Sequence, residues 1–449
     1  MAVGLNKAEL AGVDAVRAVR PEHFSPALPS SSEGFGISYH GKMPEGEILA
    51  PITSRYLKIS KSHDLEAETI NSNGFVWGDN WFALHSLIES GERAQLIYLD
   101  PPYSTGMNFA SRGQEHAYND LLGKAEYIEF MRRRLVLMRE LLQEDGSIYV
   151  HIGHQMVAEL KLVLDEIFGP QNFRNLITRK KCSSKNSTRN QYANLNDYIL
   201  FYTKSKKYIW NQPKKKATAE WIAKEYNKND ERGQYKLVPL HAPGVRNGAT
   251  GENWRGIPPP KGKHWQYAPE TLEELDASGN IYWSKTGNPR KKVYLEENKG
   301  LALTDYWDDY RDAHHQSVLI TGYPTEKNFE MMKMIVAASS VEGGLVIDPF
   351  SGSGSTIHAA DMLKRRWIGI DESFLSAKTI VSRLLDGRQP MGDFVSRMER
   401  LDMLSELEER RLIRREVGAS EFQIYVDSHI TKTHSLNIKE LRQLLRSCS

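Results

Sequence analysis

The chain has 449 residues, of which 40% are hydrophobic, and its formal net charge at neutral pH is only +2. This length is enough for roughly two or three domains, or for one large α/β domain with an insertion. Two cysteines, Cys182 and Cys448, exclude a disulfide framework and a cysteine-rich zinc site, and we predict no metal site. The nearly balanced charge identifies no partner, so nucleic-acid binding has to be inferred from the local distribution of charge.

The first fifty residues are rich in Pro, Ser and Gly, as between Pro26 and Gly36, and this composition predicts a flexible, poorly packed arm. The arm lacks the apolar core of a signal peptide, and no apolar run in the chain is long enough to span a bilayer. Together with the low cysteine content, this pattern leads us to expect a soluble, cytoplasmic protein with no membrane contact.

Strand and helix signals then alternate along the chain. Apolar runs at 96–99 and 148–152 predict buried strands, and prolines stop the first of them. Apolar residues at helical spacing predict amphipathic helices over 128–142 and 156–168. The composition changes between Arg174 and Arg311, where prolines, tryptophans and basic residues are frequent. Only 197–203 gives a clear strand signal in this region.

The alternation returns after Phe329. The predicted elements are a helix at 329–339, a strand at 345–347, a helix at 355–364, a strand at 367–370 and a helix at 373–385. Strands that alternate with helices predict an α/β fold, with a mostly parallel sheet covered on both faces. The tail after Gly387 is charged and helical as far as Glu416, with a possible strand at 422–426.

One loop with candidate chemistry follows the first predicted strand and reads Asp100-Pro101-Pro102-Tyr103. Ligands of open α/β sheets bind outside the carboxyl ends of the strands. The amino group of a base is a poor nucleophile, but a carboxylate and a proline-fixed carbonyl can accept its two hydrogens and direct its lone pair. The tyrosine offers a face on which an extruded base can stack. The alternative is a plain proline turn after a strand.

A second loop, 348–356, is rich in glycine and lies between a predicted strand and a helix, so a ligand can approach its backbone closely. Position 357 is Ile instead of the third glycine of a dinucleotide fingerprint, and no lysine follows Gly354 as a P-loop requires. Asp371, after the next strand, can accept both hydroxyls of a ribose. The pattern indicates an adenosine compound without a phosphate clamp, which points to S-adenosylmethionine; a structural turn is the alternative.

Together the two loops resemble those of the amino-methylating DNA methyltransferases. The proline loop precedes the glycine loop, which is similar to the β-class order of catalytic half, target recognition segment and cofactor half. Residues 99–106 and 146–173 most resemble the modification (Mod) subunits of type III restriction-modification systems. The resemblance covers about 75–385 and implies a Rossmann-like, S-adenosylmethionine-dependent methyltransferase fold, interrupted by an inserted target recognition domain.

The resemblance also implies roles for individual residues. The catalytic loop comprises Asp100, Pro101, Pro102 and Tyr103. The cofactor-binding residues are Asp348, Phe350, Ser351, Gly352, Ser353, Gly354 and the ribose-binding Asp371, together with Thr325, Lys327 and Asp79. Asp79 belongs to a Gly-Asp-Asn element whose alternative is a turn and helix cap. Glu326-Lys327-Asn328 departs from the usual Gln-Lys-Pro, and His151-Ile152-Gly153-His154 replaces a more acidic sequence and receives no role.

The segment between the two halves carries basic residues among hydroxyl and amide side chains, a pattern that suits contacts to phosphates and base edges. The candidate DNA-binding residues are Arg179, Lys180, Lys181, Lys185, Arg189 and Lys291. A charge run can also be a solvated face, and the tryptophans of this segment can equally form a small core.

The function predicted from these features is methyl transfer to N6 of an adenine flipped out of double-stranded DNA, within a restriction-modification system. The first alternative is N4 of cytosine, which the family often marks with Ser at the position of Asp100. An RNA or protein-amide methyltransferase usually has Asn there and lacks a large insert, and a catalytically inactive DNA-specificity module is a further alternative. The sequence has no P-loop helicase motif, so a restriction activity would need a separate subunit, and a homodimer is expected by resemblance only.

The predicted organisation has five parts: a flexible arm (1–50), the catalytic half (51–173), the target recognition domain (174–311), the cofactor-binding half (312–388) and a C-terminal extension (389–449).

Overall fold

The structure is a computed structural model, and the residues it describes are 36–53, 56–59, 65–71, 73–102, 108–110, 116–119, 123–182, 190, 192–215, 217–298, 300–312, 319–320, 323, 326–387, 389–390, 421–431 and 433–446. They divide into two compact units. The larger unit combines the residues up to Asn211 with those from Thr304 onward, and the smaller unit is Gln212–Leu303.

The larger unit is built on an eleven-stranded sheet with the order β18-β8-β9-β7-β4-β20-β21-β3-β23-β1-β2. Six neighbouring strands run parallel, namely β7 (Leu142–Ile152), β4 (Ala94–Leu99), β20 (Leu345–Asp348), β21 (Arg366–Asp371), β3 (Gly74–Trp77) and β23 (Gln423–Asp427). Antiparallel pairing occurs toward the edges, where β9 (Asn196–Thr203) pairs with β7 and β8 (Phe173–Lys180), and β1 (Tyr56–Ile59) pairs with β23 and β2 (Glu66–Ala67). The two-residue β18 (Tyr306–Trp307) lies parallel to β8.

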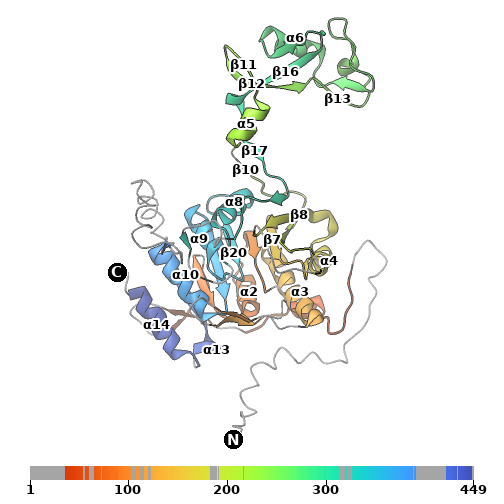
Figure 1. Ribbon diagram of the computed structural model, residues 1–449. Coiled ribbons are helices and arrows are strands. Elements are labelled where there is room, and N and C mark those ends of the chain that lie inside the picture. The colour runs from red at the N-terminus through yellow and green to blue at the C-terminus, as the bar shows by residue number, and fades with distance from the viewer. Residues whose placement is uncertain are drawn as a thin grey trace. The chain divides into compact units, whose positions relative to one another are not determined.

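Helices cover both faces of this sheet, as expected for parallel strands that are buried on both sides. One group is α2 (Asn80–Glu89), α3 (Lys124–Leu141) and α4 (Val157–Phe168), and the other is α8 (Phe329–Ser339), α9 (Ser355–Met362) and α10 (Phe374–Asp386) (Figure 1). Ile97 and Ile347 pack in one core with the first group, whereas the alternate residues Leu96 and Val346 are also buried but point to the opposite face. The predicted α/β fold with a mostly parallel sheet is confirmed.

The register brings the carboxyl ends of the central strands to one edge. Ile347 of β20 pairs with Ile97 of β4 on one side and with Ile368 of β21 on the other. Each of these strands ends within three residues of the pairing, so Asp100, directly after β4, and Asp348 and Asp371, the last residues of β20 and β21, lie at neighbouring positions. The pairing therefore joins parts of the sequence that are more than 200 residues apart.

The described part of the N-terminal region is packed against the larger unit, whereas the sequence predicts a flexible, poorly packed arm. Residues 36–50 pack on α3 and α4, and Ile48 of the short helix α1 (Glu45–Ile48) is fully buried. Glu166 accepts hydrogen bonds from the backbone N–H of Ile37 and from the ammonium of Lys42, at 2.7 and 2.8 Å. This segment is held by paired charges more than by an apolar pattern, and hydropathy therefore misses it. Residues 1–35 lie outside the described part of the chain.

The smaller unit has its own antiparallel sheet, with the order β11 (Lys228–Asp230), β12 (Gly233–Pro239), β16 (Pro289–Tyr294) and β15 (Ile281–Trp283). Trp254 and Trp265 form a core with Leu240, Ile281 and, from α6 (Pro269–Ala277), Leu272. These two tryptophans are therefore core residues, which was one of the two interpretations of the aromatic pattern. The unit is shorter than the predicted 174–311, because β8 and β9 are strands of the large sheet.

The region predicted as a C-terminal extension also contributes to the large sheet. Its β23 lies between β3 and β1, and α14 (Ser435–Arg446) packs against α10. The expected strand at 422–426 is observed one residue later, and the predicted helix up to Glu416 falls outside the described residues. Among the helices that the structure describes, none combines the length and the apolar character needed to cross a membrane.

Candidate active site

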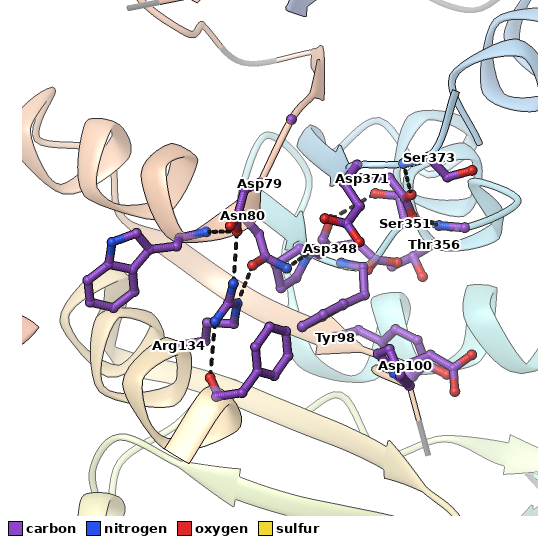
Figure 2. Close-up of a pocket in the computed structure, with 18 of the residues that line it drawn as sticks. Asp79, Asn80, Tyr98, Asp100, Arg134, Asp348, Ser351, Thr356, Asp371 and Ser373 are labelled. Atoms are coloured by element: carbon purple, nitrogen blue, oxygen red, sulfur yellow. Dashed lines mark hydrogen bonds and ion pairs between the residues drawn. The ribbon is translucent and has the colours of Figure 1, made fainter. Parts of the chain in front are cut away.

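The two loops singled out in the sequence meet at one cavity of about 410 Å³ at the carboxyl edge of the central strands (Figure 2). Asp100 follows β4, and the glycine loop from Asp348 to Ser353 follows β20; both line this cavity. Asp79 after β3 and Asp371 at the end of β21 line it as well. The geometric requirement of the sequence argument, that the proline loop and the glycine loop face each other, is therefore met.

Asp100 lies between the side chains of Lys327 and His151. Its Oδ2 forms an ion pair with Nζ of Lys327, and its Oδ1 lies 3.9 Å from Nδ1 of His151. The Asp100 side chain is 18% exposed, so it remains accessible from the cavity. Pro101 is buried and Pro102 lines the cavity, whereas Tyr103 lies outside the described residues.

The glycine loop requires its glycines for conformation and for space. Gly352 and Gly354 adopt φ angles of +50° and +73°, in the left-handed region that side chains rarely enter. A Cβ at Gly354 would lie 2.7 Å from a side-chain carbon of Ile380, and one at Gly352 would lie 3.3 Å from the ring of Tyr323. The loop can therefore keep its backbone close to the cavity only with these residues.

Asp371 holds this loop in place. Its Oδ2 accepts a hydrogen bond from the backbone N–H of Gly352 at 2.8 Å, and its Oδ1 accepts one from Ser373 at 2.9 Å (Figure 2). The sequence predicted only a ligand-binding role for this carboxylate. Glu372, the next residue, also lines the cavity and was missed, although it directly follows the predicted acid.

Acidic residues outnumber basic ones in the lining of the cavity. Its acidic residues are Asp79, Asp100, Asp348, Asp371 and Glu372, against the basic Arg133, Arg134 and Lys327. Burial raises the pKa of Asp348 to about 7, and the nearby charges of Asp100 and Asp371 act in the same direction. Burial also raises the pKa values of Asp371 and Glu372. Crowded carboxyl groups that are hard to ionise favour a cationic ligand.

Asp79 and Asn80 connect three elements around the cavity. Asp79 caps α2 by accepting from the backbone N–H of Trp81 at 2.8 Å, and it also accepts from Arg134 of α3 at 2.8 Å. Asn80 donates to the carbonyl of Pro349 at 2.8 Å and accepts from Nε of Arg134. The helix-cap interpretation of Asp79 is thus correct, and its place in the cavity lining leaves the predicted cofactor contact as a proposal.

The departure of Glu326 from the usual Gln has a structural explanation. Glu326 is only 3% exposed and accepts a hydrogen bond at 3.0 Å from Arg383, a fully buried residue of α10. The same guanidinium donates to the carbonyl of Ser353 in the glycine loop and to the hydroxyl of Ser355, both at 3.0 Å. The carboxylate of Glu326 therefore compensates the buried charge of Arg383, a pairing that the sequence pattern alone did not reveal. Thr325 lies outside the described residues.

The predicted DNA-binding residues fall into different environments. Arg179 was expected to contact DNA, but it is fully buried, donates to Asp312 at 2.5 Å and to the carbonyl of Tyr310 at 2.7 Å, and lies 3.5 Å from Asp197. This prediction is wrong, because its guanidinium is used inside the unit. Lys181 donates to Asp197 at 2.6 Å.

The other members of this set remain candidates. Lys180 is partly exposed on β8. Lys291 belongs to the smaller unit, where its ammonium donates to the hydroxyl of Tyr267 at 3.0 Å. Lys185 and Arg189 lie outside the described residues.

A family profile and two curated relatives agree with this geometry. The profile of the DNA methylase family matches residues 94–378. Type II methyltransferase M.EcaI of Enterobacter cloacae is 57% identical over 446 residues, which cover 99% of this chain and 98% of that protein. The StyLTI Mod subunit of a type III restriction-modification enzyme of Salmonella typhimurium is 30% identical over 370 residues, which cover 73% of this chain and 56% of that protein.

Among solved structures, the M1.HpyAVI–SAM complex matches 69% of this chain and 100% of that chain, with 15% sequence identity and a TM-score of 0.36. From the profile, which spans more than half of the sequence, and from the end-to-end match to M.EcaI, we conclude that the chain belongs to the N6/N4 DNA methylase family of DNA methyltransferases.

Proposed function

We propose that this DNA methyltransferase transfers a methyl group from S-adenosylmethionine to N6 of an adenine that is flipped out of duplex DNA. The observation that carries the proposal is that Asp100 and the glycine loop line one cavity, although they lie far apart in the sequence. An acceptor for amino hydrogens thus faces a loop whose backbone a ligand can approach closely.

The residues of the cavity suit the proposed cofactor. When bound, S-adenosylmethionine supplies a methyl group on a positively charged sulfur. The five carboxyl groups of the lining favour a positive ligand, and Gly352 and Gly354 leave a cradle that side chains would fill. Asp371 and Glu372 line the cavity and would accept ribose hydroxyls in this proposal, while Phe350 and Trp81 would offer apolar surface to a nucleoside.

Asp100 would act on the base. Its carboxylate and the carbonyl of Pro101 would accept the two hydrogens of the amino group, which leaves the nitrogen lone pair free to form the new bond. As the nitrogen gains the methyl group it becomes positive, and a fixed carboxylate stabilises that charge. The nitrogen would then lose a proton to solvent, with Asp100 as the relay. Stacking of the base on Tyr103 completes the proposal.

The choice of adenine rests on the aspartate at position 100, because the family often carries Ser there in enzymes that modify cytosine. The relatives named as a type II methyltransferase and a type III Mod subunit support a place in a restriction-modification system. We propose that any cleavage belongs to a separate chain, that the unit 212–303 reads the recognition sequence, and that the enzyme works as a homodimer.

Sequencing with modified-base detection tests the reaction. Plasmid DNA from a methylation-free host that expresses the protein should carry N6-methyladenine at one short sequence. N4-methylcytosine at that sequence would overturn the choice of base, and unmodified DNA from cells with abundant folded protein would overturn the function.

Asp100→Ala is expected to lower methyl transfer by at least about a thousandfold while the cofactor dissociation constant changes by less than about tenfold, since this carboxylate acts mainly on the base. Single-turnover transfer and calorimetric cofactor binding measure the two quantities separately. An equal loss of both would contradict the proposed role. Glu144→Gln is a matched control, because Glu144 is an exposed carboxylate on β7 whose partner is Lys204, outside the cavity.

A further inference from the structure

His151, to which the sequence assigned no role, lies directly beside Asp100. It is the tenth residue of β7, and the parallel register pairs Leu99 of β4 with Val150, so the next residues of the two strands are level. On the other side, His151 pairs with Ile199 of the antiparallel β9. Its side chain is fully buried. A histidine in this position is flanked by β4 and β9 and shielded from solvent, yet it lies beside the candidate catalytic carboxylate.

The two ring nitrogens of His151 face different partners. Nδ1 lies 2.8 Å from the hydroxyl of Tyr98 and 3.9 Å from Oδ1 of Asp100. Nε2 lies 3.7 Å from Oδ2 of Asp197 on β9. Burial raises the pKa of Tyr98 well above its ordinary value, and the charge of Asp100 acts in the same direction, so the phenol keeps its proton. A phenol that keeps its proton can donate to Nδ1, and the ring proton then lies on Nε2, on the side of Asp197.

Burial, more than the surrounding charges, keeps the imidazole of His151 neutral. Burial lowers the pKa of His151 in spite of the opposing effects of Asp197 and Asp100, and Lys327 and Arg179 also act to lower it. Burial alone would raise the pKa of Asp197, but the nearby His151 and the hydrogen-bonded Lys181 bring it below the ordinary value. Asp197 is therefore an anion that lies 3.7 Å from Nε2 and favours a proton on that nitrogen.

From this arrangement we propose that His151 is a positioning residue for Asp100 in methyl transfer, with Tyr98 and Asp197 holding its ring. The inference rests on the proposed function of Asp100. A neutral ring beside Oδ1 leaves the carboxylate turned toward the cavity, where the amino group of the base is expected. A protonated ring would direct an N–H toward Oδ1 and draw the carboxylate away from the base.

The groups that face His151 come from four segments: Tyr98 and Asp100 from β4 and its loop, Asp197 from β9, Arg179 from β8, and Lys327 from the segment before α8. Acidification through the lowered pKa of His151 adds a positive charge next to Asp100, which already has Lys327 on its other oxygen. The proposal therefore predicts that the methyl-transfer rate of the wild-type enzyme declines as the pH falls through the pKa of His151, in part because the ring becomes charged.

The test uses substitutions that preserve one side of the ring at a time. His151→Asn keeps a polar group near Nδ1, His151→Gln keeps one near Nε2, and His151→Phe keeps neither. We expect kcat to fall by about 10- to 100-fold in the Asn and Gln variants and further in the Phe variant, because small displacements of a reacting group cost this much. The cofactor dissociation constant should stay within about threefold of the wild-type value.

The pH profile separates positioning from simple packing. The kcat of the Asn variant should change less on acidification than that of the wild-type enzyme, since the titrating ring is absent. His154→Asn, an exposed histidine three residues away that contacts Asn194, serves as the control and should retain wild-type kinetics.

The remaining outcomes are decisive as well. Wild-type kcat with an unchanged pH profile in the Asn and Gln variants would overturn the positioning role. A parallel loss of cofactor binding and thermal stability in all three variants would also overturn it, since the histidine would then be structural. Wild-type protein that transfers no methyl group would instead overturn the proposed function.

Discussion

At the residue scale, the cavity combines carboxyl groups that differ in how easily they ionise. Asp348 ends β20 with 2% exposure, and it accepts a hydrogen bond from the backbone N–H of Phe350. Burial outweighs this bond and raises its pKa to about 7. A cationic ligand next to it would favour the ionised form, so ligand binding and proton release should be coupled.

We therefore predict that the affinity for S-adenosylmethionine rises with pH up to about 7 and then levels off. Below the raised pKa the protonated Asp348 attracts the sulfonium less, whereas above it the carboxylate is already charged in the free protein. Calorimetry in buffers of different ionisation enthalpy should detect net proton release near neutral pH.

S-adenosylhomocysteine, whose sulfur is neutral, is the matched ligand control and should release fewer protons. Asp348→Asn should remove most of the pH dependence. The same pH dependence in this variant and in the wild type would contradict the assignment to Asp348.

At the element scale, residues 36–50 belong to the predicted arm, but they pack on the larger unit and contribute Met43 to the cavity lining. Met43 lines the cavity, its backbone N–H donates to Glu129 at 3.0 Å, and its carbonyl accepts from Arg132 at 2.7 Å. Glu166 holds the segment through Ile37 and Lys42. Burial alone would raise the pKa of Glu166, but these donors bring it below the ordinary value.

Glu166→Gln should lower the free energy of local unfolding of this segment by about 2 kcal/mol, the typical contribution of a hydrogen bond to a charged group. Because the folded pKa is lowered, the stabilisation is present above the ordinary carboxyl pKa and is lost as the pH falls through the folded value. Hydrogen exchange of the amides at 37–48 measures the loosening, and cofactor affinity should fall severalfold because Met43 lines the cavity.

Glu159→Gln is the matched control on the same helix, since Glu159 pairs with Lys124 instead. Equal exchange rates in the two variants would show that Glu166 does not hold the segment.

At the scale of the whole molecule, some of the basic residues between the two loops form ion pairs inside the protein, and others are exposed on its surface. Arg179 and Lys181 neutralise the buried Asp197, whereas Lys180, between them in sequence, points to the opposite face of β8 and is partly exposed. Adjacent residues of one strand thus offer a direct test of which cations reach DNA.

Lys180→Ala should reduce the slope of log K against log salt by about 1, as expected when one phosphate contact is lost. Arg179→Ala should leave the slope unchanged but lower the free energy of unfolding by about 3 kcal/mol, because it removes a partner from the buried Asp197 and from Asp312. Binding isotherms at several salt concentrations, together with thermal unfolding, measure both effects. An unchanged slope in Lys180→Ala would remove this lysine from the interface.

The sequence alone determined the fold class and most of the candidate site. The strands that end at or directly before Asp100, Asp348 and Asp371 are recognisable because apolar runs, prolines and glycines are local signals. Parallel strands then bring their carboxyl ends to one edge, so the meeting of the two loops follows from a general rule of α/β sheets.

Only the tertiary structure decided which charges act inside the protein. Arg179 and Lys180 are neighbours of similar chemistry, and their different uses follow from the side of β8 on which each lies and from Asp197 on the adjacent strand. His151 beside Asp100, Glu326 against Arg383 and the segment 36–50 on α3 and α4 are held by partners that are distant in sequence. Such pairings depend on distances between side chains from separate elements, and no periodicity within a single segment encodes them.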